Sequence, residues 1–273
     1  MKKVIPIICL IILVGMISFQ LPANSKTYDF KDLGDESKIS QLPPFYNGSG
    51  AKNFCAENPD AWKIFINEGS LVKETEKMIE VETELGSVFL ARCTLLQLEK
   101  GAKISWRWGA HIIPSRQDKY ANDAAAQLWF VFYNEHIKKF TIIGFALDKD
   151  KQFSDDWNIA AYSSSRVGTY VKYIDETNPV VEFPKDFESK YVSNISDNIL
   201  LGIAYQSDSN NSNGRGSIKS AATFHPVNFP DNTIAVDLSR IKIDETDDEK
   251  VEEFTLNEAT LELIRSFLED IGK

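Results

Sequence analysis

Short segments with the two-residue alternation of β-strands follow one another from residue 61 to residue 238, and no long helical period interrupts them. Turns rich in glycine, asparagine, aspartate and proline part these segments, as around AWKIFINEG and GTYVKYID. Many short strands at this spacing are typical of a β-sandwich or a β-barrel. The chain has 273 residues, 43% of them hydrophobic, which suffices for the core of one large β-domain. We therefore predict an all-β fold of antiparallel strands.

One segment, QLWFVFY at residues 127–133, is apolar on both faces. Successive side chains of a strand point to opposite faces, so Leu128 and Phe130 lie on one face while Trp129 and Val131 lie on the other. A strand with two apolar faces is covered on both sides. We therefore predict a central strand, whose rings belong to the core rather than to a sugar-binding surface.

The segment ISWRWG places one arginine between two tryptophans within a strand predicted at residues 102–113. Trp106 and Trp108 share one face of this strand, and Arg107 lies on the other. A charge on a covered strand must be paired or reach water. Asp123 stands near the start of the next strand, so one prediction is an ion pair between Arg107 and Asp123. The alternative is that Arg107 lines a pocket, where its planar guanidinium holds a carboxylate or phosphate.

The N-terminus, MKKVIPIICLIILVGMISFQLPANS, has the three-part layout of a secretory signal peptide. Two lysines precede an apolar run at residues 4–19, and the small residues Ala23 and Ser25 follow it. The run is shorter than the roughly 20 residues that a spanning helix needs. We predict cleavage near Ser25, export to the periplasm or the medium, and no stable membrane anchor after cleavage.

The rest of the chain divides by composition. Residues 26–50 are rich in Pro, Gly, Ser and Asp and are predicted to form an extended lead-in, and residues 51–240 to form the β-sandwich. Residues 241–273 hold the acidic block DETDDEKVEE and then LNEATLELIRSFLEDIGK. The latter has apolar residues at helical spacing, so we predict an acidic linker and an amphipathic C-terminal helix.

Charge and cysteines narrow the possible partners. Cleavage after residue 25 removes two lysines and no acid, which changes the formal net charge from −10 to −12. A nucleic-acid partner is not expected, because phosphate binding draws on clustered lysine and arginine. Cys55 and Cys93 remain after cleavage, and in an oxidising compartment two cysteines can pair. The sequence does not decide between a disulfide and two separate buried thiols.

Two regions carry a family resemblance. SWRWGAHIIPSRQDKYANDAAAQLWFVF (105–132) has a W-R-W strand, a loop, an Asp-Ala-Ala turn and a hydrophobic strand; NILLGIAYQSDSNNSNGRGSIKSAATF (198–224) has a Gly-Ile strand, an Asp- and Asn-rich turn and a closing strand. Both resemble a bacterial exported family catalogued as domain of unknown function 3047, over about residues 60–226. Gln127 stands where an arginine is usual, and Asn210 where the later turn has a second aspartate. The resemblance implies an exported β-sandwich of jelly-roll type and no particular reaction.

The turn SDSNNSNGRG, residues 207–216, offers oxygen ligands at Asp208 and Asn210, as calcium loops do. Its glycine comes one place late, and Lys219 stands where a calcium loop has glutamate. We predict an ordinary turn and no cofactor, with a structural calcium ion as the alternative. Arg215, at the glycine-flanked tip, can touch a ligand. The predicted ligand-binding residues are Trp106, Arg107, Trp108, Asp123, Asp208, Asn210 and Arg215.

The sequence does not fix an activity. The export signal and the strand pattern favour non-catalytic recognition of a glycan or another cell-envelope component. One alternative is an enzyme that acts on polysaccharide, a lyase or a hydrolase. Another is an envelope scaffold that docks a partner through the C-terminal helix. The oligomeric state stays open.

Overall fold

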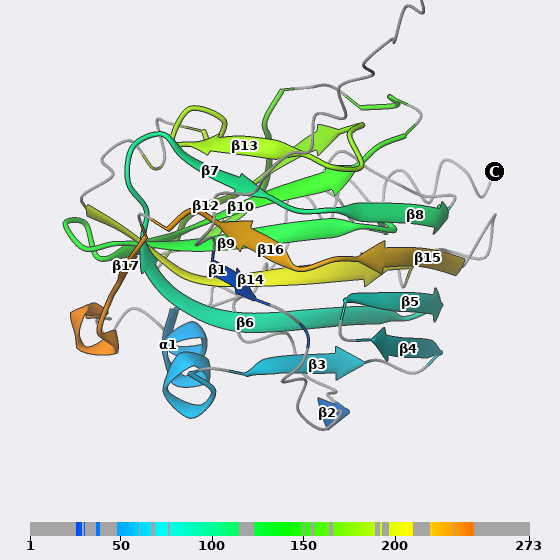
Figure 1. Cartoon of the computed structure of the whole chain (residues 1–273), viewed down its shortest axis with the longest axis horizontal. Helices are drawn as coiled ribbons and strands as arrows, with labels where there is room; N and C mark the ends of the chain where they lie inside the picture. The colour runs from blue at the N-terminus through cyan, green and yellow to red at the C-terminus, as the bar shows by residue number, and fades with distance from the viewer. Residues whose placement is uncertain are drawn as a thin grey trace, which may run out of the picture.

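A computed structural model gives the three-dimensional structure of the chain (Figure 1). It describes residues 26–28, 30, 37–38, 48–59, 61–66, 69–75, 77–114, 123–149, 151–153, 156–163, 166–188, 192, 197–209, 219–231 and 233–242. The predicted signal peptide and the predicted C-terminal helix lie outside these residues. Within the part of the chain that the structure describes, no helix has the length and hydrophobicity that a bilayer crossing requires.

A nine-stranded sheet, here called the large sheet, forms one layer of the molecule. Eight strands follow one another in the order β11-β12-β10-β9-β14-β6-β3-β2, and β17 pairs with β6. Their bounds are β2 Ser37–Lys38, β3 Trp62–Ile66, β6 Ser87–Gln97, β9 Gln127–Asn134, β10 Lys139–Leu147, β11 Asn158–Ser163, β12 Arg166–Ile174, β14 Asn198–Asp208 and β17 Ile234–Ala235.

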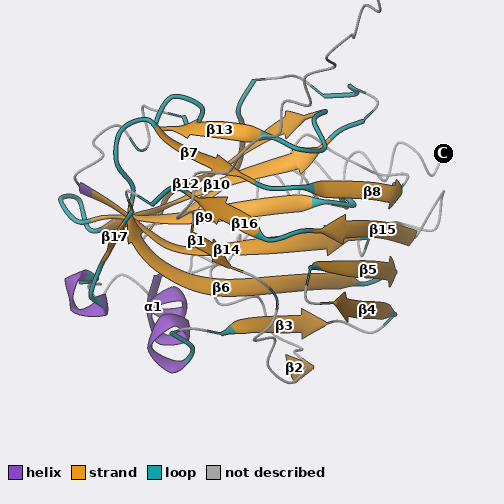
Figure 2. Cartoon of the chain, viewed as in Figure 1, coloured by secondary structure: helices purple, strands orange, loops and turns teal. Residues whose placement is uncertain are grey.

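Two four-stranded sheets form the other layer (Figures 1 and 2). The first small sheet has the order β1-β16-β7-β13 and the second has β4-β5-β15-β8. Their strands are β1 Lys26–Tyr28, β4 Ser70–Thr75, β5 Met78–Glu84, β7 Ala102–Ser105, β8 Trp108–Ile112, β13 Val180–Phe183, β15 Lys219–Phe224 and β16 Val227–Phe229. Helix α1 spans Gly48–Glu57, and the 3-10 helix η3 spans Leu238–Arg240.

Two neighbouring segments of the chain run from one small sheet into the other. Residues 102–112 supply β7 to the first sheet and β8 to the second, and residues 219–229 supply β15 and β16. At the crossing, the backbone N–H of His225 donates to the carbonyl oxygen of Arg107 at 2.9 Å. Pro226 follows and has no N–H to continue the ladder. The two small sheets are therefore halves of one layer, and we call the line that divides their ladders the crease.

The main core fills the space between the two layers. The ring of Trp106 lies 5.4 Å from Phe145 on β10 and 5.9 Å from Phe130 on β9, between centroids. Phe187, which follows β13, meets Phe130 at 5.3 Å. Burial of each such side chain contributes about 1.5–3 kcal/mol, so these rings hold the layers together.

Helix α1 covers one end of the large sheet's outer face. Its residues Phe54 and Cys55 belong to a second buried cluster that contains Ala91 of β6 and Ala204 of β14. These small side chains leave room for the helix against the sheet. A disulfide between Cys55 and Cys93 of β6 fixes it there, so the sequence alternative of a disulfide is the one that the structure has.

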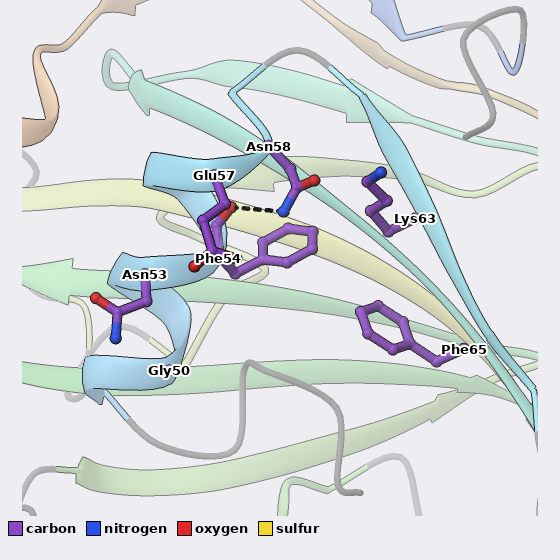
Figure 3. Close-up of a pocket in the computed structure, with 7 residues that line it drawn as sticks. All are labelled: Gly50, Asn53, Phe54, Glu57, Asn58, Lys63 and Phe65. Carbon is purple, nitrogen blue, oxygen red and sulfur yellow. Dashed lines mark hydrogen bonds between the residues drawn. The ribbon is translucent and has the colours of Figure 1, made fainter. Parts of the chain in front are cut away.

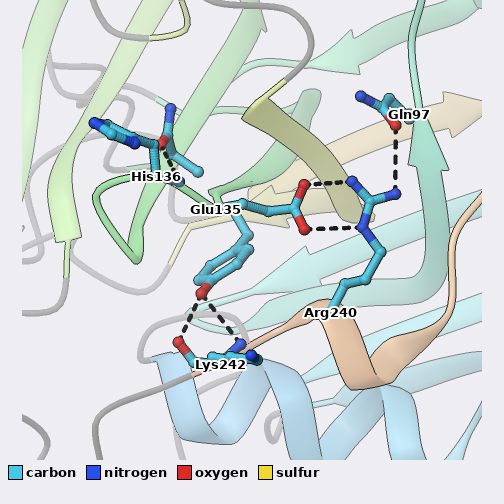
Figure 4. Close-up of polar contacts among 7 residues, drawn as sticks. Gln97, Glu135, His136, Arg240 and Lys242 are labelled. Atoms are coloured by element: carbon cyan, nitrogen blue, oxygen red, sulfur yellow. Dashed lines mark hydrogen bonds and ion pairs between the residues drawn. The ribbon is translucent and has the colours of Figure 1, made fainter.

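The last described residues are fastened to the large sheet beside α1 (Figure 4). The guanidinium of Arg240 donates from Nε to the Glu135 carboxylate at 2.8 Å and makes a second bond to its other oxygen. The Tyr133 hydroxyl donates to the Lys242 carbonyl oxygen at 2.6 Å and accepts from the Lys242 N–H at 3.1 Å. These contacts fix where residues 238–242 leave the sandwich.

The predicted fold class is confirmed: the chain is an all-β sandwich of jelly-roll type, mostly antiparallel. Two pairs, β10 with β12 and β2 with β3, are parallel. The predicted strand at 102–113 is divided at the crease, although its alternation holds across the break. Segment 127–133 is central, as predicted, with β10 on one side and β14 on the other.

Candidate functional site

The two tryptophans of the W-R-W segment lie in the main core. Trp106 and Trp108 are each 2% exposed, and their rings meet edge to face at 5.4 Å. The indole nitrogen of Trp108 donates to the carbonyl oxygen of Glu176 at 2.9 Å. Their side chains offer no surface to a ligand and serve the packing of the two layers.

Arg107 is exposed, on the side of the crease that faces away from the core. The prediction that it pairs with Asp123 is wrong: β8 belongs to the second small sheet and Asp123 precedes β9 of the large sheet. The four ion pairs among the described residues do not include Arg107. Its charge acts instead on His225.

We expect His225 to titrate below its ordinary pKa of 6.5. Burial lowers the pKa of His225, the charge of Arg107 lowers it further, and the hydrogen bond from Nδ1 to the Lys77 carbonyl opposes the shift. Neutral His225 thus favours the folded state above pH 6.5, and this contribution is lost as the pH falls through the lower, folded-state pKa. NMR titration should show the pKa of His225 rising in Arg107→Gln and unchanged in Lys103→Gln, a charge change on β7. If the pKa of His225 did not change in Arg107→Gln, the Arg107 side chain would not lie close to His225.

Asp208 and the segment that carries Asp123 meet at one end of the large sheet. The backbone N–H of Asp208 donates to the carbonyl oxygen of Ala124 at 3.0 Å, and the amide of Gln127 donates to the same oxygen at 3.3 Å. Gln206 also contacts Asp208, because its Nε2 donates to the Asp208 carboxylate at 3.0 Å. We call Asp123, Gln127, Trp129, Gln206 and Asp208 the polar cluster.

The polar cluster is built by the pairing of β9 with β14. Gln127 and Gln206 are cross-strand partners, so their side chains share the outer face of the large sheet. Asp123 is fully buried and has a φ of 51°, a left-handed conformation that aspartate tolerates better than most residues. Asp208 is 7% exposed. The carboxylate of Asp208 and the amides of Gln127 and Gln206 thus lie at one end of the sheet, next to the segment that carries Asp123, and all four side chains are largely shielded from water.

Trp129 lies at the edge of this cluster and is half-buried, whereas the other rings of segment 127–133 are buried in the core as the sequence predicts. Its indole nitrogen donates to Oε1 of Gln206 at 3.0 Å. A Cβ atom added to Gly144, its partner on β10, would lie 2.3 Å from the indole ring, so the ring lies against the bare backbone of β10. The glycine and the hydrogen bond together fix the orientation of the ring, and part of its surface reaches the outside.

A separate pocket lies between α1 and β3, with a volume of about 360 Å³ (Figure 3). Gly50, Asn53, Phe54, Glu57, Asn58, Lys63 and Phe65 line it. It shares the outer face of the large sheet with Trp129, but β6 and β14 separate β3 from β9.

This pocket was not predicted from the sequence. Its helix has low intrinsic propensity, with two glycines in its first turn, and falls where the sequence predicts an extended segment and the start of the sandwich. The apolar spacing of Ala51, Phe54 and Cys55 was the available signal, because residues three and four apart share a helix face.

Asn210 and Arg215, the other predicted ligand-binding residues, lie outside the described residues, as does most of the calcium-like turn. Among the described residues, no group of three or more histidine, cysteine, aspartate or glutamate side chains is placed to hold a metal ion.

No protein-family model and no curated protein matches the sequence. Among solved structures, the chain is similar to the xyloglucanase domain of NopAA, a type three effector from Sinorhizobium fredii in complex with cellobiose, at 9% identity and a TM-score of 0.35, over 59% of this chain and 87% of that one. It is also similar to a loop-swap mutant of Necallimastix patriciarum Xyn11A, at 9% identity and a TM-score of 0.35, over 62% and 91% of the two chains. A third likeness is to an endo-1,4-β-xylanase from Trichodrema reesei, at 11% identity and a TM-score of 0.33, over 61% and 96%. These likenesses are too distant to assign a function to this chain.

Proposed function

We propose that the protein is exported and recognises a glycan, without catalysis, on the outer face of the large sheet at Trp129 and the polar cluster. The observation that carries the proposal is the fixed orientation of Trp129, held by Gln206 and Gly144. Sugar recognition combines an aromatic surface for the apolar face of the ring with a few placed polar groups for its hydroxyls. Trp129 supplies the first, and Gln206 and Asp208, which keep 8% and 7% of their surface exposed, supply the second.

Export is part of this proposal and rests on the N-terminal sequence. The disulfide between Cys55 and Cys93 supports it, because disulfides persist in oxidising compartments and are rare in the cytosol. The chain's acidity fits an uncharged or mixed ligand better than a polyanion.

A second candidate function is hydrolysis or elimination on a polysaccharide. The observation that favours it is that Asp208 bonds through its N–H to Ala124, the residue after Asp123, so two aspartates come from neighbouring segments at one end of the sheet. Glycosidases act through two carboxylates. Product release from an oligosaccharide by wild type, and its loss in Asp208→Asn, would favour this candidate over recognition. The scaffold alternative depends on the predicted C-terminal helix, whose residues lie outside the described part of the chain.

Binding to an array of neutral and acidic oligosaccharides tests the recognition proposal. We expect wild type to bind at least one class, and Trp129→Ala to weaken that binding at least tenfold, as truncation of a central aromatic contact does. Trp157→Ala is the matched control, because Trp157 is also half-buried but packs against the main core near β11. Failure of wild type to bind any glycan, or equal losses in the two variants, would reject the proposal.

A further inference from the structure

We propose that the pocket between α1 and β3 is a second binding site, which takes a small zwitterion with an apolar body, the chemistry of a free α-amino acid. The inference does not depend on glycan recognition, because the pocket lies on the far side of β6 and β14 from Trp129. Its volume of about 360 Å³ falls at the lower end of the range of ligand pockets, roughly 300–1,000 Å³, so it suits a ligand of this size.

The two walls of the pocket carry opposite charges. Glu57 is on the last turn of α1, and Lys63 is on β3 (Figure 3). None of the ion pairs among the described residues includes either side chain. A carboxylate and an ammonium group that line one pocket without pairing are complementary to a ligand that brings an ammonium group and a carboxylate of its own.

Between these charges the pocket is aromatic. The rings of Phe54 and Phe65 lie 6.2 Å apart at an angle of 47°, one from each wall. Phe89 of β6 meets Phe65 edge to face at 6.3 Å and supports it from the sheet. An apolar side chain of the ligand would be buried against these rings, which a strongly hydrated sugar would use less fully.

The amides of the pocket are also available to a ligand. The Nδ2 atom of Asn58 donates to the carbonyl oxygen of Phe54 at 3.2 Å, which orients the amide and leaves its oxygen as an acceptor for an ammonium group. Asn53 adds an exposed amide on the helix. The disulfide from Cys55 to β6 holds this wall in place, so the pocket is formed before a ligand binds.

NMR titration of the mature protein with phenylalanine tests the site. We expect saturable shifts of backbone amides in α1 and β3, and binding about tenfold weaker for N-acetylphenylalanine, which lacks the ammonium group, and for phenylalanine amide, which lacks the carboxylate. Glucose is the neutral saccharide arm, and diphenylalanine distinguishes a peptide from a free amino acid.

The variants assign each charge to its partner. Glu57→Gln should weaken the binding of phenylalanine about tenfold, and N-acetylphenylalanine should then bind as well as phenylalanine. Lys63→Gln should also weaken the binding of phenylalanine about tenfold, and phenylalanine amide should then bind as well as phenylalanine. Lys52→Gln, a charge change on α1 outside the pocket lining, should leave binding unchanged, as should Trp129→Ala. No shift with phenylalanine, equal binding of both blocked analogues, or tighter binding of glucose would overturn the proposal.

Discussion

Trp106→Ala should lower the free energy of unfolding by about 3–5 kcal/mol. The indole is 2% exposed and its ring lies within 6 Å of Trp108, Phe130 and Phe145, between centroids, so truncation leaves a cavity between the two layers. Collapse around the cavity is restricted, because the layers are held by other rings on every side. Urea unfolding of the two proteins, followed by far-UV circular dichroism, measures the difference.

Two further variants sharpen this prediction. Trp129→Ala, which removes a half-buried ring, should cost only about 1–2 kcal/mol. Trp106→Phe should also cost less than Trp106→Ala, because the Trp106 indole nitrogen is buried with no hydrogen-bond partner among the described residues, and phenylalanine removes that N–H while it keeps an aromatic ring. If Trp106→Ala were no more destabilising than Trp129→Ala, Trp106 would not be part of the core.

Loss of the disulfide is the other large effect, and we expect it to cost about 4 kcal/mol, on the chain-entropy account of a closed loop. Cys55 and Cys93 are 38 residues apart in the sequence, so their bond removes much freedom from the unfolded chain. The bond also anchors α1, which besides Cys55 contributes Ala51 and Phe54 to the buried cluster against the sheet. The double variant Cys55→Ala with Cys93→Ala tests the prediction in chemical denaturation.

Reduced wild type is the control for the double variant. Both should lose the same stability and both should lose the phenylalanine-induced shifts in α1, because the helix wall of the pocket is no longer fixed. Trp129 should be unaffected, since Gln206 and Gly144 hold it without the helix. An unchanged unfolding midpoint on reduction would mean that the packing of α1, not the bond, positions the helix.

The strand pattern was enough to predict the class of fold and the faces of individual strands. Trp106 and Trp108 fall on one buried face with Arg107 opposite, and β9 is apolar on both sides, because alternation is a local property of the backbone. The pattern also indicates polar residues in unusual places. Gln127, a polar residue at the start of an apolar strand, is part of the polar cluster.

The pairing of strands that are far apart in the sequence could not be predicted from the alternation of side chains. The predicted ion pair between Arg107 and Asp123 requires consecutive strands to be neighbours in one sheet. Between these two residues, however, the chain crosses from the second small sheet to the large sheet. The contact of Asp208 with Ala124 depends on the pairing of β14 with β9, more than sixty residues apart in the chain. Pockets between such elements are set by tertiary packing, so local patterns do not locate them.

The crease at Arg107 and His225 has a consequence for shape. Adjacent strands of a sheet rotate by about 20–25°, so a sheet as wide as the large one turns far from one edge to the other. A flat cover of four strands would part from such a surface at its corners. Because the opposing layer is divided at the crease into two sheets with separate hydrogen-bond ladders, each sheet can follow its own portion of the twisted surface. Exposed Arg107 thus lies where one half of the cover ends and the other half begins.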